Sequence, residues 1–397
     1  MVASATVVRA VSDDVSSRAD AVVDLSHRIH ADPEVAWEEE RSSAAVAEML
    51  SAAGFAVTHG AYELPTALRA ERGTGPLTVT VCAEYDALPG LGHACGHNLI
   101  AASAVTTACA LASVADDLGL RVVVLGTPAE EGGGGKIVLL ERGAFADAHL
   151  AVMAHPGPLD VARAQPYAVD HLHVAYTGKT AHAAAYPEHG VNAADAFTVA
   201  QVAIGLLRQQ LPDDVRVHGI VTHGGDVPNA IPGRTEGRWY VRAGTTDAML
   251  EAGAKVHRCF EAGALATGCE LEVWRGSEPY AEFRTDEWLL GRYRARADEF
   301  GRVLVPADDP AARMNRASTD MGNVSQVVPA IHPYYGIGSL PAVNHQPEFA
   351  AASVTPVADE AMLSASTALA LAVCDAVSDP EQRARLMQRA GERTFDA

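Results

Sequence analysis

A cysteine and several histidines and glutamates have side chains that suit metal-dependent hydrolysis. They are Cys95, His97, Glu130, Glu131 and His155. Thiolate, imidazole and carboxylate together form a mixed ligand set for a borderline-soft divalent ion such as Zn, Mn, Co or Ni. In such a site, one of two adjacent carboxylates can bind metal, while the other takes a proton from metal-activated water and passes it to a leaving amine. The adjacent pair of glutamates fits this division of labour.

Each of these residues follows an apolar run that predicts a β-strand. The predicted strands span 77–83, 121–126 and 149–154, and helices are predicted over 99–114 and 136–142. Apolar strands that alternate with helices indicate a mostly parallel sheet covered on both faces, the α/β class. In open α/β sheets, ligands bind at the carboxyl ends of the strands. We therefore expect the three strand ends to form one shared site.

Two other chemistries fit parts of this pattern. Residues 132–136 read Gly-Gly-Gly-Gly-Lys, but no Ser or Thr follows the lysine and the GxxxxGK spacing of a phosphate loop is absent. Cys95 with a histidine can also form a thiol nucleophile, a hypothesis that leaves Glu130, Glu131 and His155 without a role. A cysteine-nucleophile amidase therefore stays an alternative, and sensitivity to chelators would distinguish it from a metal enzyme.

A non-catalytic metal-binding protein is a second alternative. It predicts that the proton-accepting glutamate of the adjacent pair is lost, whereas both glutamates are present.

The middle of the chain has a different order of elements, strand-helix-strand-strand-helix-strand, which is the ferredoxin-like arrangement. Its length of about 110 residues is typical of a separate domain. We predict a discontinuous α/β catalytic domain, 1–166 with 280–397, interrupted by an inserted α+β domain over 167–279. The predicted elements of the insert are strands 167–177, 216–222, 235–243 and 269–274 and helices 192–211 and 246–267.

Helices are also predicted near both ends of the chain, over 15–31, 37–53 and 356–377. The charged tail from Asp379 onward is expected to be frayed or peripheral. The apolar stretch 99–114 is too short and too rich in small residues to span a bilayer, so we interpret it as a buried helix.

Composition limits the cellular setting and the partners. Lys and Arg number 30 and Asp and Glu 50, for a formal charge of −20, which argues against nucleic acid or an anionic membrane as a partner. The six cysteines are scattered without a CxxC pair, so we expect reduced thiols and a cytoplasmic location. The first residues lack the pattern of a signal peptide.

Taken together, the motifs resemble the M20 family of metallopeptidases and amidohydrolases, within its amidohydrolase branch. The resemblance is closest to the subgroup that holds aminobenzoyl-glutamate hydrolase and dipeptidases. It extends in the family's order over nearly the whole chain. The matching segments are 84–89, 93–98, 128–136, 178–184, 228–232, 318–323 and 344–349.

The resemblance implies roles for individual residues of the catalytic domain. The implied ligands of two divalent metal ions are Cys95, His97, Glu131, His155 and His345. Cys95 stands where many relatives have a bridging aspartate. Glu130 is the implied general base, and Asp86 the implied support of a metal-binding histidine. One departure is Asn98, where many amidohydrolases of this branch have Asp.

The resemblance also implies that the inserted domain is a lid that forms a homodimer. His182 matches a lid histidine that can reach the partner subunit's active site and stabilise the oxyanion. Asn229 matches a lid residue near the substrate. The implied reaction is hydrolysis of a small amide by metal-activated water, with Glu130 as the base.

The substrate is left open between an N-acyl amino acid, an aminobenzoyl-glutamate-like conjugate and a dipeptide. Arg234, Arg238 and Arg242 share one face of a predicted strand because they are spaced by four. Arg242 is our candidate for binding a substrate carboxylate, although a solvated strand face explains the same spacing. A dipeptide ending in Lys or Arg would instead call for acidic groups.

Overall fold

A computed structural model describes residues 2–392, and the chain divides into two compact units. The first unit comprises Met1–Pro166 and Phe283–Ala397, and the second comprises Tyr167–Glu282. The second boundary follows Glu282, whereas the sequence placed it after residue 279. The reason is local: Tyr280 forms a β-bridge with Val169, and the Glu282 carboxylate accepts hydrogen bonds from Thr246.

The first unit is built on a six-stranded sheet in the order β1-β2-β4-β3-β5-β11. The last four are mutually parallel, as predicted, whereas β1 and β2 form an antiparallel hairpin that joins β4 antiparallel. The hairpin was not predicted, because β1 is short and mostly exposed and so lacks an apolar run. The strands are β1 (Ala56–His59), β2 (Leu68–Arg72), β3 (Leu77–Ala83), β4 (Leu120–Gly126), β5 (Leu150–Val152) and β11 (Ala330–Ile331).

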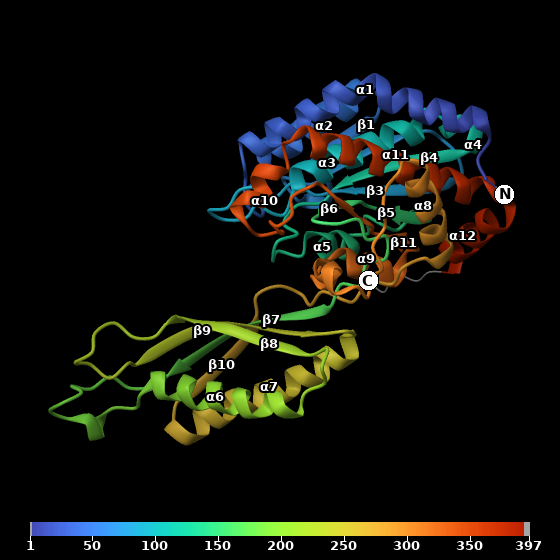
Figure 1. Cartoon of the computed structure of the whole chain (residues 1–397). Coiled ribbons are helices and arrows are strands. Elements are labelled where there is room, and N and C mark those ends of the chain that lie inside the picture. The colour runs from blue at the N-terminus through green and yellow to red at the C-terminus, as the bar shows by residue number, and fades with distance from the viewer. Residues whose placement is uncertain (1, 393–397) are drawn as a thin grey trace. The chain divides into compact units, whose positions relative to one another are not determined.

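Both faces of this sheet are covered by helices (Figure 1). Along β3, Val79 and Val81 join the core beneath α1, α3 and α11, whereas Cys82 joins the core on the side of α5 and α9. This alternation buries the strands on both faces and explains their continuous apolar runs. The helices are α1 (Ala5–Ala31), α2 (Glu40–Ala52), α3 (His97–Ala112), α5 (Gly135–Glu141), α9 (Met321–Val327) and α11 (Pro356–Ser378).

The remaining elements of the first unit are α4 (Ala115–Leu118), β6 (His155–Gly157), α8 (Glu287–Glu299), β12 (Tyr334–Gly336), α10 (Pro347–Ala352) and α12 (Pro380–Glu392). Of these, β6 and β12 pair in parallel and form a separate two-stranded sheet.

The C-terminal segment corrects part of one prediction, that the tail is frayed or peripheral. The charged tail is not frayed as far as Glu392, because it forms α12. Leu386 is buried, the Arg383 guanidinium donates to the Leu118 carbonyl at 2.8 Å, and Arg385 pairs with Asp286 at 2.7 Å. Residues 393–397 lie outside the described residues.

In the described part of the chain, α11 alone is long and apolar enough to cross a membrane. Its most apolar window is 83% buried within the protein. Burial of that extent is typical of the central helix of a protein core.

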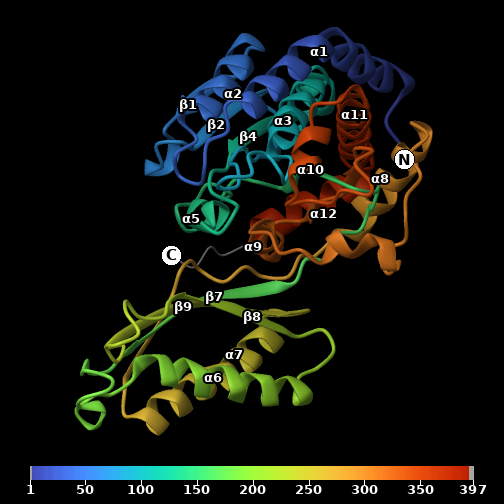
Figure 2. The same ribbon diagram turned by 60° about the vertical axis from the view of Figure 1, so that its left-hand side comes forward.

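The second unit has the predicted ferredoxin-like topology. Its four antiparallel strands are arranged β10-β7-β9-β8. Two helices, α6 and α7, lie side by side on one face of this sheet (Figure 2), and Trp239 and Phe260 are buried between the layers. The elements are β7 (Ala168–Thr177), α6 (Ala193–Leu207), β8 (Arg216–His223), β9 (Arg234–Ala243), α7 (Thr246–Thr267) and β10 (Glu270–Arg275).

A buried carboxylate in α11 anchors the chain's first residues, and it yields a stability prediction. Asp375 is fully buried and accepts hydrogen bonds from the Ala3 backbone N–H and from the guanidinium groups of Arg292 and Arg296. Asp375→Asn is expected to lower the free energy of unfolding by roughly 3 kcal/mol, because Arg292 and Arg296 lose their buried counter-charge and Arg296 keeps only Glu299. Chemical denaturation of the metal-free protein at pH 7 measures this loss.

The interaction of Asp375 with the two arginines also predicts a pH dependence of stability. Burial by itself raises the pKa of Asp375, but hydrogen bonds from Arg296, Ala3 and Arg292 outweigh it, so the pKa is lowered. The ion-pair stabilisation is therefore present above the unfolded-state pKa of about 3.9 and is lost as the pH falls through the lower folded-state value. The difference between wild type and variant should shrink below about pH 4. An equal difference at pH 7 and pH 3 would contradict this assignment.

Candidate metal-dependent active site

The structure brings the five predicted metal ligands and the predicted base together in the first unit. Cys95 lies in the loop between β3 and α3, His97 begins α3, and His155 begins β6. The two glutamates follow β4, and His345 lies just before α10. The strand ends therefore meet as the α/β pattern predicted, and the C-terminal part of the chain adds one histidine.

Two groups of possible ligand atoms share the sulfur of Cys95. In one group, Cys95 Sγ lies with ring nitrogens of His97 and His155, and in the other it lies with Glu131 and His345. All atoms within each group are within 4.8 Å of one another. Cys95 Sγ is 3.7 Å from His155 Nε2, and Glu131 Oε1 is 3.3 Å from His345 Nε2. One sulfur common to two ligand groups is the arrangement that a bridge between two ions requires.

Hydrogen bonds at the far side of two histidine rings turn their other nitrogens toward this centre. His97 Nδ1 bonds the Asp86 carboxylate at 3.0 Å, and His155 Nδ1 bonds the Pro156 carbonyl at 2.7 Å. In the neutral form of each ring, which is the form that binds metal, Nδ1 therefore carries the proton and Nε2 keeps its lone pair. Metal-binding histidines are typically oriented in this way. The unpartnered Nε2 of His97, the His155 Nε2 beside the Cys95 sulfur and the buried thiol itself fit a divalent metal ion.

Asp86 holds two parts of the site at once. Its second oxygen accepts the backbone N–H of Glu131 at 2.9 Å. Burial alone raises the pKa of Asp86, but the charge and hydrogen bond of His97 outweigh it and lower the pKa. An ionised Asp86 thus fixes both the His97 ring and the loop that carries the paired glutamates.

Two loops of the site have left-handed backbone conformations that are unusual outside glycine. Ala129 has φ 55° and His345 has φ 69°. The Glu39 carboxylate accepts the Ala129 N–H at 2.8 Å, and the Asn344 side chain donates to the carbonyls of Cys95 and Pro156 at 3.3 Å. Strain of this kind persists where surrounding contacts over-determine it, and it clusters at functional sites. No sequence pattern pointed to Glu39, and Asn344 was noted only within the motif that contains it.

The paired glutamates differ in electrostatic environment. Burial and the neighbouring carboxylates of Glu84 and Glu131 raise the pKa of Glu130 well above its ordinary value. Burial also raises the pKa of Glu131, but its hydrogen bond to His345 and the charge of His97 reverse the shift and lower it. The pKa values of the two carboxyls are thus shifted in opposite directions. Glu130 is the carboxyl that can accept a proton, and Glu131 is the one that stays an anion.

The environment of Cys95 disfavours the thiol-nucleophile alternative. Burial raises the pKa of the Cys95 thiol, and the charge of Glu131 raises it further. Nucleophilic cysteines need the opposite shift, because the thiolate is the reactive species. A buried thiol of this kind becomes a thiolate when a metal ion binds to it.

The remaining predicted residues lie in the second unit. His182 and Asn229 are in adjacent exposed loops, since the Asn229 carbonyl accepts the Ala183 N–H at 3.0 Å. His182 Nδ1 accepts the backbone N–H groups of Ala184 and Ala185 at 3.3 and 3.2 Å. The proton of a neutral ring therefore sits on Nε2, which makes that nitrogen a donor.

The three arginines of β9 occupy one face of the strand, as their spacing predicted, but they differ in their partners. Arg234 pairs with Glu236 at 2.8 Å and Glu272 at 3.1 Å, which offsets its charge. The Arg242 guanidinium donates to His218 at 3.3 Å and lies 5.6 Å from the centre of the Tyr240 ring.

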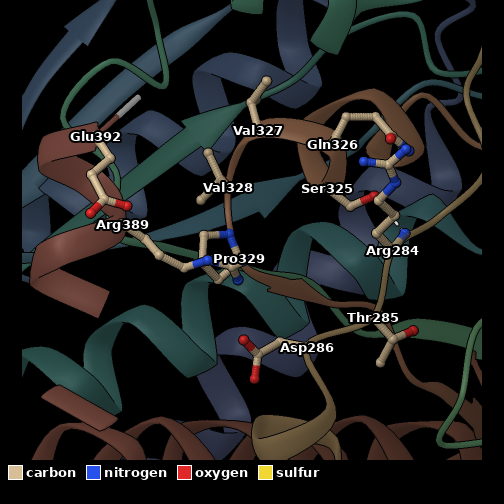
Figure 3. Close-up of a pocket in the computed structure, with 10 residues that line it drawn as sticks. All are labelled: Arg284, Thr285, Asp286, Ser325, Gln326, Val327, Val328, Pro329, Arg389 and Glu392. Atoms are coloured by element: carbon tan, nitrogen blue, oxygen red, sulfur yellow. Dashed lines mark hydrogen bonds between the residues drawn. The ribbon is translucent and has the colours of Figure 1, made fainter. Parts of the chain in front are cut away.

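A pocket of about 360 Å³ in the first unit is distinct from this centre (Figure 3). It is lined by residues 284–286, 325–329, Arg389 and Glu392, and none of these is a predicted site residue. Asp286 in its wall caps α8 and pairs with Arg385. The pocket carries both signs of charge and contains no cysteine or histidine.

Known proteins are similar in sequence to this chain over most of its length. Residues 80–366 match the peptidase family M20/M25/M40. The chain is 39% identical over 387 residues to the Xaa-Arg dipeptidase of Mus musculus, covering 94% of this chain and 89% of that protein. It is 29% identical over 287 residues to one of the subunits of p-aminobenzoyl-glutamate hydrolase from Escherichia coli K12, covering 67% of this chain and 60% of that protein.

Among solved structures, the fold is similar to that of the Bacillus subtilis YXEP protein, described as a dinuclear metal binding peptidase from the M20 family. The TM-score is 0.67, with 21% identity, 90% of this chain covered and 98% of that chain covered. Coverage of this extent includes both units, so the combination of an α/β unit with an inserted α+β unit is shared.

Proposed function

Because this chain belongs to the peptidase family M20/M25/M40, we propose that it is a dinuclear metallo-dipeptidase in which Glu130 is the general base. Membership confirms the predicted family and the predicted class, metal-dependent hydrolysis of amide bonds in small substrates. The observation that carries the site assignment is the sulfur of Cys95, shared by two ligand groups beside Glu130. The proposed ligands are Cys95, His97, Glu131, His155 and His345.

The proposed cofactor is a pair of divalent ions of the Zn, Mn, Co or Ni type. When bound, such ions supply Lewis acidity that polarises an amide carbonyl and makes water a nucleophile near neutral pH. The chain's own groups do the rest. Glu130 takes a proton from the attacking water and delivers it to the leaving amine, and Asp86 keeps the His97 ring in place.

His182 of the second unit is the proposed donor to the developing oxyanion, in agreement with its Nε2–H tautomer. His182→Ala is expected to lower kcat about 100-fold, because one oxyanion donor is lost, without changing the number of metal ions bound. Steady-state kinetics together with metal analysis tests this prediction. The matched control is His257→Ala, an exposed histidine on α7, which should leave kcat unchanged. Equal activity of His182→Ala and wild type would remove His182 from the mechanism.

Dipeptides are the proposed substrate class, and a C-terminal arginine is the preferred side chain. This choice is supported by the 39% identity with a protein named for Xaa-Arg dipeptides. The substrate's free carboxylate calls for a cation, and Arg242 is the proposed partner, with Asn229 contributing hydrogen bonds. The cationic side chain of a C-terminal arginine calls for an acidic group in addition. An aminobenzoyl-glutamate-like conjugate or an N-acyl amino acid carries the same carboxylate and differs in the groups around it.

A comparison of substrates tests the preference for a C-terminal arginine. Metal-loaded protein would be assayed with Ala-Arg, Ala-Lys, Ala-Glu, aminobenzoyl-glutamate and N-acetyl-alanine under identical conditions. The proposal expects the highest kcat/KM for dipeptides with a cationic C-terminal residue. A higher kcat/KM for aminobenzoyl-glutamate would assign the chain to the conjugate hydrolases instead.

We further propose a homodimer formed through the second unit and a cytoplasmic location. The edge strand β8 supports the first point, because Ile220 and Val221 are exposed on it and its outer edge is available for pairing. Six cysteines in the reduced state support the second. Light scattering of the purified protein tests the dimer.

A further inference from the structure

A buried lysine and two carboxylates lie next to the proposed metal centre, and no role was predicted for them. Lys136 is fully buried at the start of α5. Its ammonium group donates to Glu84 Oε1 at 2.5 Å and to Asp320 Oδ1 at 2.7 Å, and its backbone N–H donates to Asp320 Oδ2 at 2.8 Å. Lys136 and Asp320 therefore hold the Glu84 carboxylate in one orientation.

The other oxygen of Glu84 points toward His97. Glu84 Oε2 lies 3.6 Å from His97 Nε2, and both side chains are fully buried. Neither atom has a hydrogen-bond partner within residues 2–392. A metal-binding histidine is neutral, and in the neutral ring the proton lies on Nδ1, which bonds Asp86. In that form His97 Nε2 and the Glu84 oxygen are two acceptors that face each other in the protein interior. Unsatisfied buried acceptors are costly unless a cation lies between them.

The spacing of these atoms suits a shared cation. Two donors bound tetrahedrally to one ion at about 2.1 Å lie about 3.4 Å apart. The 3.6 Å between Glu84 and His97 is close to this value, and Glu131 Oε1, from a proposed ligand, lies 4.0 Å from the same His97 nitrogen. Oxygen atoms of Glu84 and Glu130 and a nitrogen of His97 are all within 4.8 Å of one another, so a cation held by Glu84 and His97 would lie beside the proposed base.

We infer that Glu84 is an additional carboxylate ligand of the metal centre, and that Lys136 and Asp320 are its positioning residues. This inference rests on the proposed metal-dependent function and adds a ligand to it. Since Lys136 occupies one oxygen, Glu84 offers only the other and binds through a single atom. The charges of the three groups, two negative and one positive, leave one negative charge to balance a divalent ion.

A purely structural ion pair makes a different prediction. If Glu84 only balanced the charge of Lys136, neutralising it would destabilise the protein but leave metal affinity unchanged. If Glu84 binds metal, the same change weakens metal binding. Thermal stability and metal affinity must therefore be measured separately.

The test is Glu84→Gln, which preserves side-chain shape and an oxygen for Lys136 while removing the charge. Metal-free protein is titrated with Co²⁺ and with Mn²⁺ against a competing chelator, and the visible spectrum of the Co²⁺ form is recorded. We expect affinity for one of the bound ions to weaken about 100-fold, with a changed Co²⁺ spectrum. Asp375→Asn is the matched control, since it removes another fully buried, cation-paired carboxylate whose partners are remote from the site.

Asp320→Asn gives a second, milder variant, in case Glu84→Gln does not fold. It weakens the ion pair that holds Lys136 in place, and it is expected to lower the metal affinity of the same site about tenfold. Unchanged Co²⁺ affinity and spectrum in either folded variant would overturn the inference. Failure of the wild-type protein to bind Co²⁺ and Mn²⁺ would instead overturn the proposed function, so the two failures are distinguishable.

Discussion

Replacing Glu130 by glutamine is expected to lower kcat about 1,000-fold while the protein keeps its metal ions. Glutamine has the shape of glutamate but does not take a proton from the attacking water or return one to the leaving amine. Burial and the negative charges of Glu84 and Glu131 raise the pKa of Glu130, which suits a group that must hold a proton between two steps. The measurement is kcat and metal content on the same preparation.

Two comparisons make the Glu130 result specific. Asp375→Asn removes a buried carboxylate remote from the site, so at a temperature where the variant is folded its kcat should match wild type. Glu131→Gln, in contrast, is expected to lose metal as well as activity, because Glu131 is a proposed ligand. Turnover within tenfold of wild type in Glu130→Gln would show that another group is the base.

Replacing Cys95 produces the second large effect, loss of the metal centre. Cys95→Ser is expected to reduce metal content below one ion per chain and to abolish activity, because the shared sulfur of two ligand groups is replaced by a poor ligand. Metal analysis by mass spectrometry after dialysis measures the loss. Full metal content in the serine variant would remove Cys95 from the ligand set.

Cys95→Asp separates the two roles considered for this cysteine. A carboxylate can bridge two ions, so the aspartate variant should keep metal and a measurable fraction of the activity. A thiol nucleophile has no such replacement, so under that alternative the variant would be inactive whether or not metal is bound. The raised pKa of the buried thiol argues against the nucleophile role.

The sequence predicted most of the site because its residues follow strands with strong apolar patterns. Cys95, Glu131 and His155 come after three buried strands, and parallel strands place their carboxyl ends at one edge. His345 was different, since it follows no predicted strand and has a left-handed backbone conformation. Its assignment depended on the family resemblance, and the structure places its ring 3.3 Å from Glu131.

The Glu84 cluster shows what pattern alone does not supply. Lys136 was assigned no role, although it was noted in a rejected phosphate-loop pattern, at the start of a predicted helix and in one of the segments that resemble the M20 family. Its partner Asp320 lies 184 residues away, and no local spacing links the two. A fully buried lysine requires a carboxylate partner, but the identity of that partner is set by the tertiary fold.

The fold shows the same division between local and long-range information. Continuous apolar runs predicted β3 and β4, and alternation with helices predicted their parallel pairing. The hairpin of β1 and β2 was missed because both strands are short and β1 is mostly exposed, so they carry little hydrophobic pattern. The helix α12 was missed because its stability depends on Leu386 and on Arg383 bonding to the distant Leu118 carbonyl.

The most direct test of the account is metal reconstitution. The protein would be stripped with a chelator, titrated separately with Zn²⁺, Mn²⁺, Co²⁺ and Ni²⁺, and assayed for hydrolysis of Ala-Arg at each step. The account predicts an inactive metal-free protein and activity that returns with at least one of these ions, reaching its maximum at two ions per chain. Full activity in the metal-free protein would contradict it.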